Sequence, residues 1–217
     1  MSLPKPYYTD EFCTIYHGDS RELLPLIDAD VMVTDPPYGI AYESGRYQHA
    51  SFEGQIQGDD NGDLMAWALR QVMPYVVFGA NNSSHAIRRG AAWAVWDKRC
   101  SEAADRILGS PFELMAAAGT KSKAYRIYRI LHGGAVNANG KGPRQHPTEK
   151  PIELMRRVIL DYTPEGTIID PFMGGGSTLR AAKDLGRKCI GIEIDEKWCD
   201  VAVKRLAQDN LFTDGAA

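Results

Sequence analysis

The stretch Val31-Met32-Val33-Thr34-Asp35-Pro36-Pro37-Tyr38-Gly39 joins a short apolar run to two consecutive prolines. The β-branched residues predict a buried strand, and the prolines end it because they lack the N–H that a β-ladder needs. Each proline also restricts the residue before it, so we expect Asp35 and Pro36 in extended conformation. The stretch therefore predicts a carboxylate, an outward-pointing carbonyl and the flat ring of Tyr38 at the carboxyl end of one strand.

These groups suit one kind of ligand. Asp35 and the Pro36 carbonyl supply two hydrogen-bond acceptors beside the aromatic face of Tyr38. Such a set matches a planar ring that carries an exocyclic amino group. An ordinary strand-ending turn is the competing interpretation, because Asp-Pro is frequent in turns.

A second motif lies near the C-terminus: Asp170-Pro171-Phe172-Met173-Gly174-Gly175-Gly176-Ser177-Thr178 follows a predicted strand over 167–169. Glycines between a strand and a helix allow a tight turn and a close approach of the backbone to a ligand. Glu193 ends the next predicted strand, 188–193, at a spacing typical of an acid that binds ribose hydroxyls. Dinucleotide-binding folds share this pattern, so the glycines alone do not decide the ligand.

A third stretch, His146-Pro147-Thr148-Glu149-Lys150-Pro151, precedes the glycine motif. Together the three stretches resemble the motifs of the amino-group DNA methyltransferases, which methylate adenine N6 or cytosine N4. The first resembles their catalytic motif and the second their motif for S-adenosylmethionine (SAM). Because the catalytic motif comes first, the order resembles the β group of this family. The resemblance runs from about Tyr16 to Leu206.

Predicted strands alternate with predicted helices along the chain, which indicates a doubly wound, mostly parallel α/β sheet. The ligands of such sheets lie beyond the carboxyl ends of the strands. The resemblance implies a Rossmann-like methyltransferase sheet of seven strands, one of them antiparallel. We expect residues 1–217 to form a single catalytic domain.

The acid in front of the glycines favours SAM over NAD. A carboxylate at Asp170 would repel a pyrophosphate but suits a cationic sulfonium, and no Walker lysine follows the glycines. The resemblance implies that Phe172 and Gly174 line the methionine moiety and Glu193 binds the ribose. It also implies that Thr148 and Lys150 help to hold the carboxylate end, and that Asp19 contacts the adenine, unless Asp19 is simply a helix N-cap. The predicted cofactor-binding residues are Asp19, Asp35, Thr148, Lys150, Asp170, Pro171, Phe172, Gly174, Gly176, Ser177 and Glu193.

The resemblance assigns catalysis to Asp35, Pro36, Pro37 and Tyr38. The target base must leave the DNA duplex to reach this site, and Tyr38 is its expected stacking platform. The sequence contains no Pro-Cys pair, which a methyltransferase acting on a cytosine ring carbon would need for its nucleophile.

The segment 120–150 is rich in basic residues, although the chain has a formal charge of -3. A basic, glycine-rich stretch with interleaved Tyr125 and Tyr128 predicts a flexible DNA-contacting segment, whereas a solvated charged face is the ordinary alternative. The predicted DNA-binding residues are Lys121, Lys123, Arg126, Arg129, Lys141 and Arg144.

The irregular segment 40–61 follows the catalytic motif directly. Long loops within compact domains are often functional, so we expect a lid over the target base, with a disordered surface loop as the alternative. Between Gly119 and Lys150 there is little room for a large target-recognition insert, so the sequence does not predict a recognition site.

The chain has 217 residues, of which 44% are hydrophobic. It contains neither an apolar run that could cross a bilayer nor a signal-peptide pattern, so we expect no membrane partner. Four scattered cysteines predict reduced thiols in a cytoplasmic protein and no metal site.

N6 of adenine in DNA is the expected target, because Asp rather than Ser before Pro-Pro-Tyr leans towards adenine in the family. Cytosine N4, an RNA or protein amide, and a non-catalytic nucleic-acid-binding module remain alternatives. A homodimer is common in the resembled group.

Overall fold

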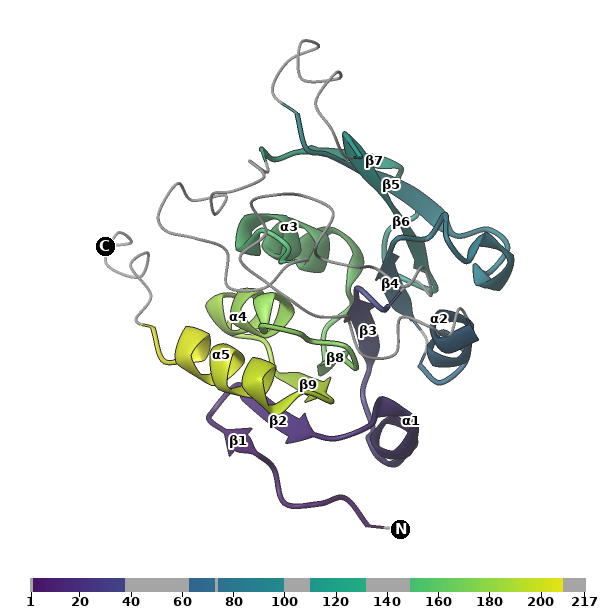
Figure 1. Ribbon diagram of the computed structural model, residues 1–217. Coiled ribbons are helices and arrows are strands. Elements are labelled where there is room, and N and C mark those ends of the chain that lie inside the picture. Colours follow the sequence, from purple (N-terminus) through teal and green to yellow (C-terminus); the bar gives the residue numbers. More distant parts are fainter. Residues whose placement is uncertain (1, 38–62, 73, 100–109, 132–148, 209–217) are drawn as a thin grey trace, which may run out of the picture.

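The computed structural model describes residues 2–37, 63–72, 74–99, 110–131 and 149–208. Within these ranges the chain forms a nine-stranded sheet in the order β1-β2-β9-β8-β3-β4-β6-β5-β7 (Figure 1). The strands are β1 (Tyr8–Thr9), β2 (Cys13–His17), β3 (Val31–Thr34), β4 (Tyr75–Phe78), β5 (Ala92–Asp97), β6 (Phe112–Ala118), β7 (Arg126–Arg129), β8 (Ile168–Asp170) and β9 (Cys189–Glu193). The helices are α1 (Ser20–Leu23), α2 (Asp63–Ala68), α3 (Ile152–Tyr162), α4 (Ser177–Asp184) and α5 (Glu196–Leu206), with short 3₁₀ turns η1 (Leu24–Leu26) and η3 (Ser84–Ala86).

The predicted doubly wound, mostly parallel sheet is confirmed. Strands β2, β9, β8, β3 and β4 pair in parallel, and β6 lies antiparallel between β4 and β5. The inner seven strands, β2 to β5 in sheet order, therefore match the expected sheet of seven with one antiparallel strand.

The predicted number of strands was too low for the sheet as described. β1 adds an antiparallel edge strand next to β2, and β7 adds a parallel edge strand next to β5. β1 has only two residues, which is too short for a periodic pattern. β7 carries two arginines and buries only Tyr128, so its residues resemble a solvated loop in sequence.

Helices cover both faces of the sheet. α3, α4 and α5 lie on one face, and α1 and α2 lie on the other (Figure 1). The side chains of β3 alternate between these faces, because Val31 and Val33 join the core beneath α3 and α4 while Met32 joins the core beneath α2. Burial on both faces explains why this strand is an uninterrupted apolar run.

The direction of β6 matters for the site. Its pairing with β5 sets Glu113 opposite Trp96 and Phe112 opposite Asp97, the last residue of β5. Because β6 runs against its neighbours, its first residues lie at the edge where β3, β4 and β5 end. Across the described ranges, the helices are all too short or too polar to span a membrane.

Candidate active site

Three carboxylates meet at one edge of the sheet. Asp35 follows β3, Asp170 ends β8 and Glu193 ends β9. β8 pairs in parallel with both β3 and β9, so the carboxyl ends of these strands are neighbours. The structure therefore places the first two motifs and Glu193 at a common edge.

Asp170 is buried and fixes the turn that follows β8. Its Oδ1 accepts a hydrogen bond from Thr34 Oγ1 at 2.7 Å and one from the Phe172 N–H at 3.1 Å. Its Oδ2 accepts one from Thr178 Oγ1 at 2.5 Å. Burial raises the pKa of Asp170 to about 6, although the Thr178 and Thr34 hydroxyls oppose the shift. Both oxygens thus accept within the protein, and Asp170 joins β3 to the glycine turn.

The glycine turn has backbone angles that favour glycine. Gly174 has a φ of 49° and Gly176 a φ of 77°, both in the left-handed region. A Cβ at position 176 would lie 2.8 Å from Ala202 Cβ in α5. The turn leads directly into α4, so two of the three glycines in the motif allow a tight connection that larger residues would strain.

Glu193 is joined to the same turn. Its Oε2 accepts from the Gly174 N–H at 3.0 Å and its Oε1 from the Asp195 N–H at 2.9 Å. Burial raises the pKa of Glu193 to about 7, and the two backbone N–H groups limit the rise. The carboxylate at the end of β9 is therefore hydrogen-bonded to the glycine turn after β8.

Asp19 caps α1. Its Oδ1 accepts from the Arg21 N–H at 2.8 Å, and its Oδ2 pairs with Arg21 Nη2 at 2.6 Å. The helix-cap alternative for Asp19 is thus confirmed, while a contact with a cofactor stays a prediction. The neighbouring Ser20 is buried and donates to the carbonyl of Pro171, which joins the start of α1 to the glycine turn.

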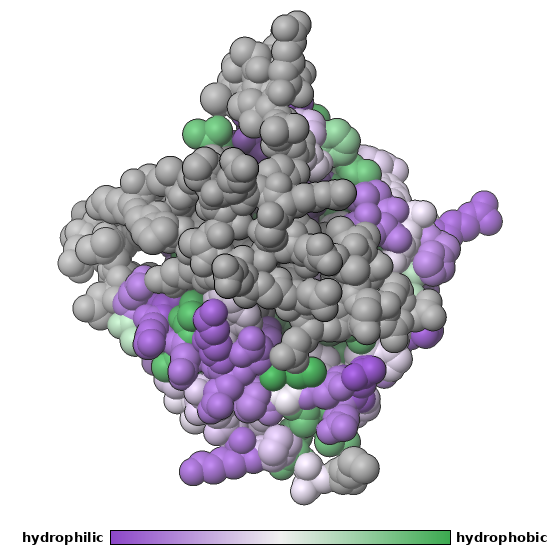
Figure 2. Space-filling view, viewed as in Figure 1, coloured by the Kyte–Doolittle hydropathy of each residue, from purple (hydrophilic) through white to green (hydrophobic). Residues whose placement is uncertain are grey.

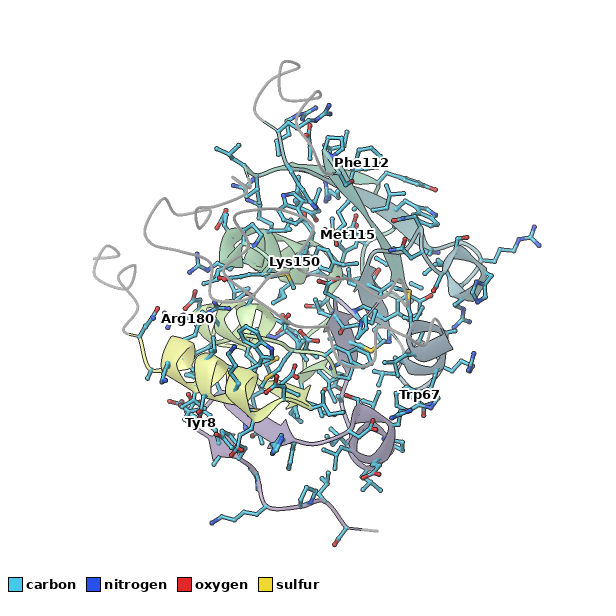
Figure 3. The ribbon with its side chains drawn as sticks, viewed as in Figure 1. Tyr8, Trp67, Phe112, Met115, Lys150 and Arg180 are labelled. Carbon is cyan, nitrogen blue, oxygen red and sulfur yellow. The ribbon has the colours of Figure 1, made fainter. Side chains whose placement is uncertain are left out.

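Lys150 lies in the interior of the protein (Figure 3). Its Nζ donates to Asp35 Oδ2 and lies 3.1 Å from Glu113 Oε1. Burial alone would lower the pKa of Lys150, but the Asp35 and Glu113 carboxylates outweigh burial and raise it above its ordinary value. The role that the resemblance implies for Lys150, at the carboxylate end of the cofactor, stays a prediction. In the structure Lys150 contacts Asp35 of the catalytic motif.

Two buried contacts near these motifs were not predicted from the sequence. Glu113 is the one charged residue in the run 112–118, and an acid in an apolar strand is a signal for a special role. Arg205, in α5, is buried and donates to Ser177 Oγ at 2.9 Å and to Glu149 Oε1 at 2.7 Å. It therefore connects the start of α4 to the segment that carries Lys150.

The described part of the basic segment contains the edge strand β7. In β7, Arg126 Nε lies 3.4 Å from Asp161 Oδ2, and Arg129 Nε lies 4.0 Å from Asp97 Oδ2. Lys121 and Lys123 are exposed, and so are Tyr125 and Ile127. At this end of the molecule, apolar and polar side chains lie side by side (Figure 2).

Several predicted site residues lie outside the described residues: Tyr38, Thr148, Lys141, Arg144 and the expected lid over 40–61. Of the other catalytic residues, Pro36 is buried and Pro37 is partly buried. Among the described residues, no group of His, Cys, Asp or Glu side chains is arranged to hold a metal ion. Cys13, Cys189 and Cys199 are buried free thiols.

The chain is similar to known DNA methylases. A family model for DNA methylases, N6_N4_Mtase, matches residues 80–204. Type II methyltransferase M2.LlaDCHI of Lactococcus lactis subsp. cremoris is 27% identical over an alignment 253 residues long, gaps included. The alignment covers 94% of this chain and 93% of the relative.

Two solved structures share the fold. The crystal structure of the M1.HpyAVI–SAM complex has a TM-score of 0.56 and 26% identity, and the match covers 90% of this chain and 100% of that chain. PvuII DNA methyltransferase, named as cytosine-N4-specific, has a TM-score of 0.63 at 18% identity, with 95% of this chain and 90% of that chain covered. The second similarity concerns the fold alone.

Proposed function

The chain belongs to the N6/N4 family of DNA methylases, and from this premise we propose that it transfers a methyl group from SAM to N6 of adenine in DNA. The single observation that supports the proposal best is the shared sheet edge. Asp35 lies there beside the glycine turn that Glu193 holds. The reacting amino group and the methyl donor can therefore meet at neighbouring strand ends.

The residues at this edge fit SAM. Glu193 offers a partly buried carboxylate for ribose hydroxyls, and the left-handed turn at Gly174 and Gly176 brings the backbone close to a ligand. Phe172 and Gly174 would line the methionine part, and Asp19 would contact the adenine. Asp35 and Asp170 make the edge acidic, which suits a cationic sulfonium and opposes a pyrophosphate. When bound, the cofactor supplies an electrophilic methyl group.

Asp35 prepares the amino group of the base. This nitrogen is a poor nucleophile because its lone pair is delocalised into the ring. The Asp35 carboxylate and the Pro36 carbonyl accept hydrogen bonds from its two N–H groups. These hydrogen bonds favour a pyramidal nitrogen with its lone pair directed at the methyl group. Asp35 then takes the proton that the nitrogen releases. Tyr38, the next residue after the prolines, stacks on the base after it leaves the duplex.

Cytosine N4 is the second candidate, because the family model that matches the chain covers both N6 and N4 methylases. The chemistry of Asp35 and Pro36 would serve either amino group. The aspartate in front of Pro-Pro-Tyr favours adenine.

Transfer of tritium from labelled SAM to DNA tests the proposal. The substrate is DNA amplified in vitro, which carries no methyl groups, and the product is hydrolysed to nucleosides and separated. We expect the label in N6-methyladenine. Label in N4-methylcytosine would assign the second candidate, and the absence of label from the DNA would reject both.

The Asp35→Asn variant is the control for the site. It keeps the shape of the side chain but replaces one acceptor oxygen with a donor. We expect the transfer rate to fall by roughly 10²- to 10³-fold, while calorimetry shows cofactor binding close to that of the wild type. Substantial residual transfer would remove Asp35 from the catalytic role.

A further inference from the structure

Glu113 reaches the active-site edge because β6 runs antiparallel to its neighbours. Its carboxylate bridges two lysines that come from different parts of the chain. Oε1 lies 3.1 Å from Lys150 Nζ, and Oε2 lies 3.1 Å from Lys98 Nζ, just beyond the end of β5. With Asp35 on the far side of Lys150, the charges alternate in sign from Lys98 to Asp35.

The burial of Lys150 explains why it needs two carboxylates. Its side chain is 9% exposed, so the ammonium ion has lost most of its hydration. Taking a charge out of water is unfavourable unless partners compensate for it. An ammonium ion has three N–H donors and can serve Asp35 and Glu113 together. Lys150 Nζ also lies 5.2 Å from the centre of the Phe78 ring, which restricts its position further.

We propose that Glu113 is a positioning residue for methyl transfer: it holds the Lys150 ammonium against Asp35, and Lys150 in turn fixes the orientation of that carboxylate. This inference rests on the proposed function, in which Asp35 accepts a hydrogen bond from the amino group of the base. An ammonium ion in contact with a carboxylate also favours its ionised form. An ionised carboxylate only accepts hydrogen bonds, which is the state that the amino group requires.

Some charges around Asp35 stabilise its ionised form and others oppose it. Lys150 stabilises the ionised form, whereas Asp170 on β8 opposes it across the same edge. Glu113 and Lys98 act through Lys150. Loss of the Glu113 charge would free Lys150 to move away from Asp35, so protonation of Asp35 would become easier.

A purely structural role is the competing explanation. In that case Glu113 only compensates the buried charge of Lys150, and its loss lowers stability without changing the chemistry. The pH dependence of the chemical step separates the two explanations, because only a positioning role moves it.

The test compares Glu113→Gln, which keeps the shape and removes the charge, with Glu153→Gln. Glu153 is the control: it lies in α3, its side chain is 44% exposed, and it pairs with Arg157 at 2.7 Å. In single-turnover assays at saturating SAM, we expect Glu113→Gln to slow transfer by roughly 10- to 100-fold. Its cofactor affinity should stay within twofold of the wild type, and Glu153→Gln should leave both unchanged.

Two further measurements support the test. The acid limb of the rate profile should move to higher pH by about one unit in Glu113→Gln. Glu113→Gln should add little to Lys150→Met, because both changes remove the same contact. If Glu113→Gln does not fold, Glu113→Asp and Lys98→Met weaken the same bridge less severely and should shift the profile in the same direction.

A titration that needs no activity keeps this inference separate from the proposed function. Carbon-13 NMR of the aspartate carboxyls, with Asp35 assigned from the Asp35→Asn variant, should give a higher titration midpoint for Asp35 in Glu113→Gln. An inactive wild type would reject the proposed function. If the wild type is active, a Glu113→Gln variant with the wild-type rate and pH profile would overturn the role of Glu113. An Asp35 titration midpoint that is the same in Glu113→Gln and the wild type would also overturn it.

Discussion

Glu193 Oε2 accepts a hydrogen bond from the Gly174 backbone N–H at 3.0 Å. This hydrogen bond joins the end of β9 directly to the turn after β8. A carboxylate placed in this way keeps its position but is partly buried, and burial raises its pKa to about 7. A group that titrates near neutral pH at the proposed ribose site makes cofactor binding depend on pH.

We expect the affinity for SAM to fall as the pH falls below 7. Ribose hydroxyls donate to the ionised form of Glu193, and a proton competes with them. With a pKa of about 7, the ionised fraction falls roughly tenfold between pH 8 and pH 6. Calorimetry at these two values should show a change in Kd of about the same size.

Glu193→Gln is the control for this dependence. This variant should bind SAM weakly at both pH 6 and pH 8, and its Kd should differ little between the two pH values. Equal affinity of the wild type at pH 6 and pH 8 would contradict the placement of the ribose at Glu193.

Gly176→Ala should destabilise the protein more than Gly186→Ala. Both glycines have positive φ, 77° and 65°, so both substitutions cost about 1–2 kcal/mol in backbone strain. At position 176 the new Cβ would also lie 2.8 Å from Ala202 Cβ, whereas nothing lies within 4 Å at position 186. Overpacking adds about 1–3 kcal/mol. Urea unfolding at one pH measures the difference.

The Ala202→Gly substitution checks the cause. It should recover part of the loss in Gly176→Ala, because it removes the methyl group that clashes, while the strain from φ remains. Equal unfolding free energies for the two single variants would show that contact with α5 is unimportant.

The strand ends were predictable because each motif is local. Thr34 to Pro37 and Asp170 to Gly176 each contain both the end of a strand and the residues that follow it. Parallel pairing then brings such ends to one edge without further information. The bounds of β6 are local in the same way, because Pro111 and Gly119 flank the apolar run that forms it.

The partner of Lys150 was not predictable in the same way. Its contact with Glu113 depends on the direction of β6, and an apolar run does not reveal whether a strand is parallel or antiparallel. The contact of Arg205 with Glu149 joins residues 56 positions apart through the packing of α5. Such contacts depend on tertiary geometry, which residue types and spacing do not specify.

Neutralising the exposed bases near β7 should weaken DNA binding and its salt dependence. Lys121 and Lys123 are exposed, whereas Arg126 and Arg129 already pair with acids. Each phosphate contact contributes about 0.9 to the slope of log K against log salt. We therefore expect a larger loss of slope from Lys121→Gln with Lys123→Gln than from the matching change of both arginines.

Arg157→Gln is the control for this experiment, because Arg157 is exposed and paired with Glu153 in α3, as Arg126 is with Asp161. Fluorescence anisotropy over a range of salt concentrations gives each slope. If the two lysine changes leave the slope at its wild-type value, the segment does not contact DNA.

Without cofactor, the protein should be more stable at pH 5 than at pH 7.5. The folded-state pKa values of Asp170, about 6, and Glu193, about 7, lie above their ordinary values of 3.8 and 4.5. Between these limits the folded protein binds more protons than the unfolded chain, so stability falls as pH rises through about 4 to 7. Carboxyls with lowered pKa values, such as Asp10 at about 2, lose their contribution only below this window.

The size of this effect can be assigned to Asp170 by substitution. Asp170→Asn cannot titrate, so the difference in unfolding free energy between pH 5 and pH 7.5 should shrink by about 1–3 kcal/mol. Glu165→Gln, whose side chain is 93% exposed, should leave the difference unchanged. Urea unfolding at both pH values measures it. A wild type that is more stable at pH 7.5, or an Asp170→Asn variant with the full pH dependence, would show that the buried carboxyl at the end of β8 does not take up a proton in this range.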